Sequence, residues 1–207
     1  NVARRFDRYD LTNDWNRLIN ARQFGGVRGE LNMGLGDMRA AGPSSASAQS
    51  PRFLPTDTLR PTETFSDRLG LDLGGLQIDL RHDRGETDDH LWAWLPEQRW
   101  LVTGDFLIWN FPNAGNPQKV QRWPIEWAAA LRTMAALDAD LLLPAHGLPI
   151  GGRTRIRTVL DTIATALENL VDEVLAMMNA GETLDTIIHT VRVPDDTLAK
   201  PYLRPLY

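Results

Sequence analysis

Residues 91–105 read Leu-Trp-Ala-Trp-Leu-Pro-Glu-Gln-Arg-Trp-Leu-Val-Thr-Gly-Asp. Two short apolar runs, 91–95 and 100–102, flank the turn-forming segment 96–99. This pattern predicts a β-hairpin whose strands are buried on both faces. Thr103-Gly104-Asp105 then places a carboxylate directly after the second strand. Because a rigid sheet can aim a polar side chain at the end of a strand, the stretch predicts both a sheet and a site at its edge.

A second hairpin is predicted upstream of the first. Leucine and isoleucine alternate with other residues over 69–80, on either side of Gly74-Gly75. Alternation with a period of two is typical of strands, and a Gly-Gly pair suits a tight turn. We therefore expect four successive strands, with the acidic residues in the loops between them.

The remainder of the chain is mostly helical. Pro124 suits the first position of a helix over 124–137, and 141–143 is a short apolar strand. From 153 to 180 apolar residues recur every three or four positions, close to a heptad seam, and Gly181 ends this helix. Strands alternating with helices in this order predict an α/β layered fold.

The amino-terminal part has a different character. Residues 1–24 alternate in charge over apolar positions and are expected to be at least partly helical. Residues 25–64 are rich in Gly, Pro and Ser without a period, which predicts a long loop. The chain begins at Asn1 rather than at a methionine, so we expect a processed, trimmed or partial product.

Composition excludes several classes of protein. The absence of cysteine from 207 residues excludes disulfides, thiolate zinc sites and cysteine nucleophiles, and it leaves the compartment open. A net charge of −5 argues against a general nucleic-acid binder. No run of apolar residues is long enough to predict a membrane span. A metal site would have to use Asp, Glu and the four histidines, His82, His90, His146 and His189.

Three predicted loops at strand ends carry side chains that can bind metal. Glu86 precedes the strand at 91–95, Asp105 follows 100–102, and His146 follows 141–143. Carboxylate and imidazole are the ligands expected for zinc, iron or manganese without sulfur. Each also has a simpler interpretation, as a solvated acidic turn, a turn residue after glycine, or a loop histidine bonded to backbone. His90 is interpreted as structural, although it could instead support a ligand.

The order of these motifs resembles the second half of the metallo-β-lactamase fold. An acidic residue lies ten positions before the proline of an L-P-E turn, followed by L-x-T-G-D, a helix, and a strand ending in P-x-H-G. Glutamate in the first position, E-T-D-D-H at 86–90 and N-A-G-N-P-Q-K-V-Q-R-W at 113–123 are similar to the alkyl sulfatase branch, which includes SDS hydrolases. The resemblance implies an αββα sandwich half over 1–152, with its long loop at 25–64, and a helical region at 153–207 that begins a dimerisation domain.

The resemblance also implies a metal-dependent hydrolase of sulfate esters. Two divalent ions are expected, as zinc or alternatively as iron or manganese, with Asp105 bridging them, Glu86 completing one site and His146 the other. Activated water would attack the alkyl carbon, and sulfate would leave. Donors in the following loop would hold the departing sulfate by charge-assisted bonds, although its two cations could equally be ordinary surface residues. These expected substrate contacts are Asn113, Gln118, Lys119 and Arg122.

One motif of that superfamily is missing. H-x-H-x-D-H, which supplies most ligands of the first metal, does not occur in the sequence. We expect it upstream in a longer parent or on a partner chain, and we expect the complete protein to be a homodimer that acts on a small-molecule ester. Two alternatives stay open. The chain could be a catalytically silent module that associates through the 153–180 seam, or a metallohydrolase of another ester, such as a lactone or a phosphodiester.

Overall fold

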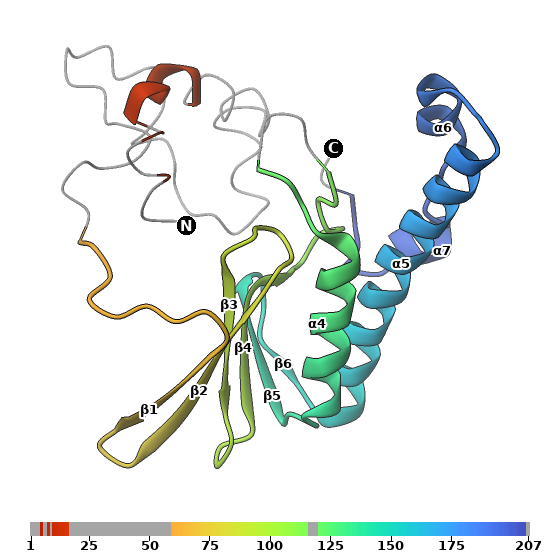
Figure 1. Cartoon of the computed structure of the whole chain (residues 1–207). Helices are drawn as coiled ribbons and strands as arrows, with labels where there is room; N and C mark the ends of the chain where they lie inside the picture. Colours follow the sequence, from red (N-terminus) through yellow and green to blue (C-terminus); the bar gives the residue numbers. More distant parts are fainter. Residues whose placement is uncertain (1–4, 6–7, 9, 17–58, 116–119, 206–207) are drawn as a thin grey trace, which may run out of the picture. The chain divides into compact units, whose positions relative to one another are not determined.

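The computed structural model describes residues 5, 8, 10–16, 59–115 and 120–205. The chain divides into two compact units, residues 1–64 and 65–207. Within the first unit, helical backbone is described inside 10–16, and most of the loop predicted at 25–64 lies outside the described residues. All the elements named below belong to the second unit (Figure 1).

Six strands form one sheet in the order β1-β2-β3-β4-β5-β6. The first four form the two predicted antiparallel hairpins, and β4 pairs in parallel with β5. Gly74 and Gly75 make the first turn, both with positive φ, which an L side chain rarely adopts. The strands are β1 (Arg68–Leu73), β2 (Leu76–Asp83), β3 (His90–Leu95), β4 (Trp100–Ile108), β5 (Leu141–His146) and β6 (Ile150–Gly151).

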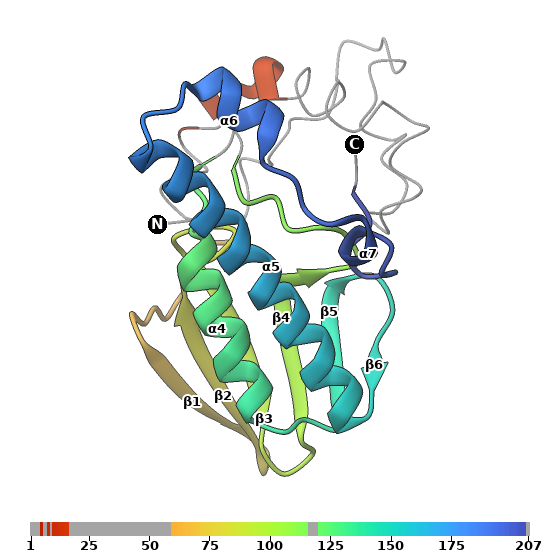
Figure 2. The ribbon, with the colours of Figure 1, turned by 90° about the vertical axis from the view of Figure 1, so that its right-hand side faces the viewer.

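Helices cover one face of this sheet (Figure 2). The longest two, α4 (Pro124–Ala136) and α5 (Arg153–Asn179), lie side by side across it. Short helices α6 (Leu184–Thr190) and α7 (Asp195–Leu198) follow. The predicted α/β class, the Pro124 start of a helix and the helical carboxy-terminal region are therefore confirmed. No helix in the described residues is both long and apolar enough to cross a membrane.

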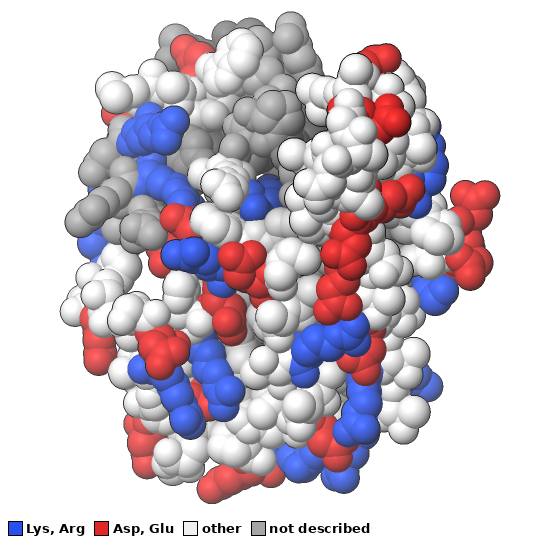
Figure 3. All heavy atoms as spheres, turned by 45° about the vertical axis from the view of Figure 1, so that its right-hand side comes forward, with Lys and Arg blue, Asp and Glu red and all other residues white. Residues whose placement is uncertain are grey.

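The first half of the α5 seam is used inside this chain. Ile156, Leu160, Ile163 and Leu167 are buried and belong to the core that α4 also lines. Arg132 of α4 reinforces this packing through ion pairs to α5, at 2.7 Å from Asp161 and 2.7 Å from Glu168. On the face drawn in Figure 3, acidic and basic side chains are interspersed over the described helices. In the second half of the seam, by contrast, Leu170, Val174 and Met177 are only partly buried.

The two faces of the sheet differ sharply in burial. On the helix side, one row of register partners runs from β2 to β6, and each of these residues is less than 10% exposed: Asp79, Trp94, Leu101, Leu142 and Ile150. The next row faces the other way and is apolar, yet none of its members is buried. This row, which we call the open sheet face, is Leu69, Leu80, Ala93, Val102 and Leu143.

The prediction that the second hairpin is buried on both faces is wrong. Val102 of the open sheet face is 36% exposed, and Leu91, on the same side of the sheet, is 47% exposed. The boundaries of β4 and β5 also differ from the prediction, because both strands continue through the motifs predicted as loops. Their parallel pairing extends past Pro144 through shifts of register, and a proline is tolerated at such an irregularity.

Candidate metal and substrate site

Asp105 and His146 are brought together by the parallel pairing of β4 and β5. The Oδ1 atom of Asp105 lies 3.5 Å from Nε2 of His146, and both side chains are partly exposed. This distance is long for a hydrogen bond. Two ligand atoms at about 2.0–2.1 Å from one tetrahedral ion would be about 3.4 Å apart. The pair therefore fits two ligands of a single divalent ion.

The glycine of the H-G motif is required by its surroundings. Gly147 has a φ of 102°, and a Cβ built on it would lie 2.0 Å from Cδ1 of Trp109. Trp109 in turn donates its Nε1–H to the Leu148 carbonyl at 2.9 Å. The indole thus occupies the space that a side chain at 147 would need, and it supports the turn that follows His146.

Glu86 lies in the connection between β2 and β3, where it contacts Arg122 rather than a second ligand. Its carboxylate is 2.8 Å from Nη1 of Arg122, which also donates to the Glu86 main-chain carbonyl. The Arg122 side chain is only 5% exposed. A buried guanidinium needs a carboxylate partner, because a charge without one is costly to bury. Two predicted site residues, one for metal and one for sulfate, therefore pair with each other.

Further contacts clamp these two segments together. The Trp123 main-chain N–H donates to the Gly85 carbonyl at 2.9 Å, and the Arg84 guanidinium lies 4.5 Å from the Trp123 ring centroid. A Cβ built on Gly85 would approach the Phe106 ring to 2.6 Å, so the loop passes directly over that ring. Gly85 thus packs against a buried aromatic ring, and the next residue, Glu86, is held by Arg122.

His90, which the sequence indicates as structural, lies against Asp105. The Asp105 main-chain N–H donates to His90 Nε2 at 3.0 Å. Burial lowers the pKa of His90, while the charge of Glu86 opposes this shift. The spacing indicates that residues 90 and 105 lie opposite each other, since they are equally far from the turn at 96–99, but it does not indicate that the His90 side chain is the acceptor.

Of the other three predicted substrate contacts, the structure describes only one. Asn113 is partly buried in the irregular segment after β4, and Gln118 and Lys119 lie outside the described residues. Within the described ranges, no group of three or more His, Asp and Glu side chains is arranged to hold a metal ion. The chain thus assembles two of the three predicted ligands, Asp105 and His146.

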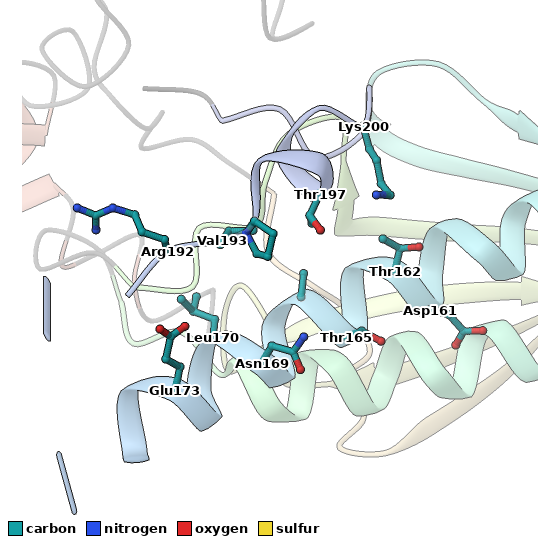
Figure 4. A pocket seen from close by; sticks show the side chains of 12 residues that line it. Asp161, Thr162, Thr165, Asn169, Leu170, Glu173, Arg192, Val193, Thr197 and Lys200 are labelled. Atoms are coloured by element: carbon teal, nitrogen blue, oxygen red, sulfur yellow. The ribbon is translucent and has the colours of Figure 1, made fainter. Parts of the chain in front are cut away.

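A cavity of about 540 Å³ lies elsewhere, between α5 and residues 192–200 (Figure 4). Its walls carry both signs of charge, with Asp161 and Glu173 on α5 and Lys200 after α7. None of the predicted site residues lines it.

Comparison with known proteins agrees with the motifs. No family model matches the chain. The chain is 30% identical over 183 residues to the linear primary-alkylsulfatase of a Pseudomonas species, an alignment that takes in 86% of this chain and 32% of that protein. The chain therefore spans about a third of the curated relative it matches, and the aligned part includes the central residues 86–146.

Solved structures with a similar fold are also alkylsulfatases. The chain matches the stereoselective inverting sec-alkylsulfatase Pisa1 from Pseudomonas sp. with a TM-score of 0.61 and 24% identity, over 68% of this chain and 23% of that one. A double mutant of that enzyme matches with a TM-score of 0.61 and 23% identity, over the same shares. The resemblance to the alkyl sulfatase branch that the motifs predict is thus confirmed in sequence, and over about two thirds of the chain the fold is that of the sec-alkylsulfatase Pisa1.

Proposed function

We propose that this chain is the part of a metal-dependent alkyl sulfatase that supplies Asp105, His146 and Glu86 to the metal site. The observation that carries the proposal is the 3.5 Å separation of Asp105 Oδ1 and His146 Nε2 on adjacent parallel strands. It is supported by the alignment of this region with a linear primary-alkylsulfatase. The remaining ligands would come from a segment that carries the H-x-H-x-D-H motif.

The donors fit a divalent ion of the zinc, iron or manganese type. Such an ion supplies Lewis acidity and activates a water nucleophile. Asp105 and His146 would hold it, and their partial exposure leaves room for further ligands. Glu86 would join the site through the carboxylate oxygen that Arg122 does not contact, so that the 2.8 Å ion pair with Arg122 would stay in place.

The substrate we propose is an alkyl sulfate ester that is cleaved at carbon. Pisa1 is an inverting sec-alkylsulfatase, and inversion at carbon requires that the nucleophile attacks carbon. The water oxygen would bond to the carbon as the carbon–oxygen bond of the ester breaks, the sulfate would leave with the bonding electrons, and the proton lost by the water would pass to solvent, which leaves the alcohol. Asn113, Gln118 and Lys119 are the proposed donors to that sulfate. Arg122 would act chiefly through Glu86, because its Nη1 is already engaged there.

The test measures bound metal and sulfate release in parallel. The chain is assayed alone and together with a relative's segment that carries H-x-H-x-D-H, with octyl sulfate as the substrate. We expect zinc, iron or manganese to bind and sulfate to be released in the combined sample. Replacing partners of metal ligands costs about 10- to 100-fold, so Asp105→Asn should cost at least about 100-fold.

Asp172→Asn, at an exposed position on α5, is the matched control and should leave the rate unchanged. Absence of stoichiometric metal from the combined sample, or an equal rate for wild type and Asp105→Asn, would contradict the proposal. Activity against a lactone or a phosphodiester, with none against octyl sulfate, would support the proposed metal site and contradict the proposed substrate class.

A second candidate function, association without catalysis, is favoured by the apolar surface that this chain leaves exposed. The open sheet face is one such surface, and the end of the helical region is another, with Leu175, Met178, Leu184 and Ile188. Light scattering separates the two candidates. A homodimer that binds no metal and releases no sulfate, even with the added segment, would support the silent module.

A further inference from the structure

The hairpin of β3 and β4 places His90 opposite Asp105. Its register partners are Ala93 with Val102, Trp94 with Leu101, and Leu95 with Trp100. Continuing the same register would set residue 90 against residue 105. The described ladder stops before that position, and the Asp105 main-chain N–H instead donates to the His90 side chain at 3.0 Å.

Gly104 explains why a side chain takes the place of a strand carbonyl. Its φ of 55° is left-handed, and β4 shifts register against β5 on both sides of it. A Cβ built on Gly104 would lie 2.9 Å from His90 Nε2 and 3.2 Å from the Leu91 carbonyl oxygen. The bulge thus turns the partly buried Asp105 N–H away from the regular ladder, where it would lack a partner in the sheet. The His90 ring supplies the missing acceptor.

The ring is itself fixed in place. Its centroid is 4.5 Å from that of Phe106, at an interplanar angle of 49°. Phe106 is fully buried, and its carbonyl accepts the Trp127 Nε1–H of α4 at 2.9 Å. A main-chain N–H can be accepted only by a ring nitrogen without a proton, so His90 is the neutral tautomer that is protonated on Nδ1.

We infer that His90 is the positioning residue of Asp105: its Nε2 fixes the β4 bulge that holds the Asp105 carboxylate 3.5 Å from His146. The contact itself stands on the geometry alone. Its consequence for metal binding rests on the proposed function, in which Asp105 is a ligand. His90 does not touch the ion or the substrate in this assignment, and it acts through the main chain of Asp105.

The experiment uses the ¹⁵N-labelled chain and reads the contact directly. A through-hydrogen-bond ¹⁵N–¹⁵N scalar coupling should join the Asp105 amide to His90 Nε2, and the His90 ¹⁵N shifts should report a protonated Nδ1. His90→Phe keeps a ring against Phe106 and removes the acceptor. His90→Gln offers an amide oxygen at a similar reach. His189→Phe, at a side chain that is 72% exposed, is the matched control.

We expect hydrogen exchange at the Asp105 amide to be about tenfold faster in His90→Phe, with protection restored in His90→Gln and unchanged in His189→Phe. Where Asp105 binds zinc in the combined sample, His90→Phe should weaken binding by about 10- to 100-fold, and His90→Gln should recover much of it. Absence of the coupling in wild type, or a proton on Nε2, would overturn the inference. The coupling and the ¹⁵N shifts are measured on the wild-type chain, so they test the inference even if a variant does not fold.

The zinc measurement and the coupling measurement can fail independently of each other. A coupling without zinc binding in any sample would support the positioning contact while contradicting the proposed function. Zinc binding without the coupling would support the proposed function and contradict the positioning contact.

Discussion

The Glu86 carboxylate and the Arg122 guanidinium form a 2.8 Å ion pair in which the arginine side chain is almost wholly buried. The two residues are 36 positions apart, and Arg122 also binds the main chain of Glu86. The pair therefore fixes both the position and the charge environment of a proposed metal ligand. It links the connection before β3 to the segment that leads into α4.

Replacing Glu86 should lower the free energy of unfolding more than replacing Arg122. Glu86→Gln leaves the buried Arg122 without its countercharge and should cost about 3 kcal/mol of unfolding free energy. Arg122→Gln leaves Glu86, which is 28% exposed and can regain water, so about 1–2 kcal/mol is expected. Urea unfolding of both single variants and the double variant gives the coupling between them.

Arg132→Gln is the control for that experiment. Arg132 pairs with Asp161 and Glu168, but all three side chains are more than a third exposed, so a loss of about 1 kcal/mol or less is expected. Equal costs for Glu86→Gln and Arg132→Gln would show that the buried position of Arg122 adds nothing.

Stability should fall below about pH 6.5 through His90. Burial lowers the pKa of this imidazole; Arg122 and His82 lower it further, and Glu86 opposes them. Between the folded and unfolded pKa values, the unfolded chain binds a proton that the folded chain resists. The unfolding free energy therefore decreases with falling pH in that window, by up to about 1.4 kcal/mol per pH unit.

Urea unfolding at several pH values measures this slope. His90→Gln has no titrating group at this position, so its unfolding free energy should depend less on pH over the same range. The other three histidines are present in both proteins, so the difference isolates His90. The same slope in both proteins would contradict the prediction.

Local patterns predict the fold well where one interaction dominates. Alternating leucines around Gly74-Gly75 indicate the first hairpin, and Pro124 indicates the start of α4. They miss the extension of β4 and β5, because it depends on parallel pairing between segments some 40 residues apart in sequence. Short-range rules for Gly and Pro end both strands too early.

The site is predictable only in part, for a similar reason. The motifs identify Asp105 and His146, and the sheet brings them together. The sequence does not indicate that Arg122 pairs with Glu86, because charge alone does not tell whether a cation lies at the surface or is buried against a partner. The role of His90 requires the bulge at Gly104, which no periodicity reveals.

Gly147 should be far less replaceable than Gly181. In Gly147→Ala the new methyl would meet the Trp109 ring at 2.0 Å and would also impose a φ of 102° on an alanine. Gly181 has a φ of 83°, and no described atom lies within 4 Å of the place a methyl would take there, so only the backbone term applies. We expect about 1 kcal/mol for Gly181→Ala and at least about 3 kcal/mol for Gly147→Ala, measured by urea unfolding. Similar costs would show that Trp109 moves away freely.

Placing a charge on the open sheet face should cost little unfolding free energy. Shortening the neighbouring side chain, which lies on the buried face, should cost much more. Val102 is 36% exposed and Leu101 is fully buried, although they are adjacent in β4. Val102→Lys should therefore change the unfolding free energy by no more than about 0.5 kcal/mol, whereas Leu101→Ala should cost about 2–5 kcal/mol.

Removing an apolar group from this face should also reduce the binding of a hydrophobic dye such as ANS, and Leu91→Lys should reduce it further. Lys substitution on the exposed side of α5, as in Asp172→Lys, serves as the control for added positive charge, because Asp172 does not line the cavity. A cost for Val102→Lys that equals the cost of Leu101→Ala would mean that the face is packed against another part of the protein. The dye would then bind wild type and variant equally, because neither would present this face to solvent.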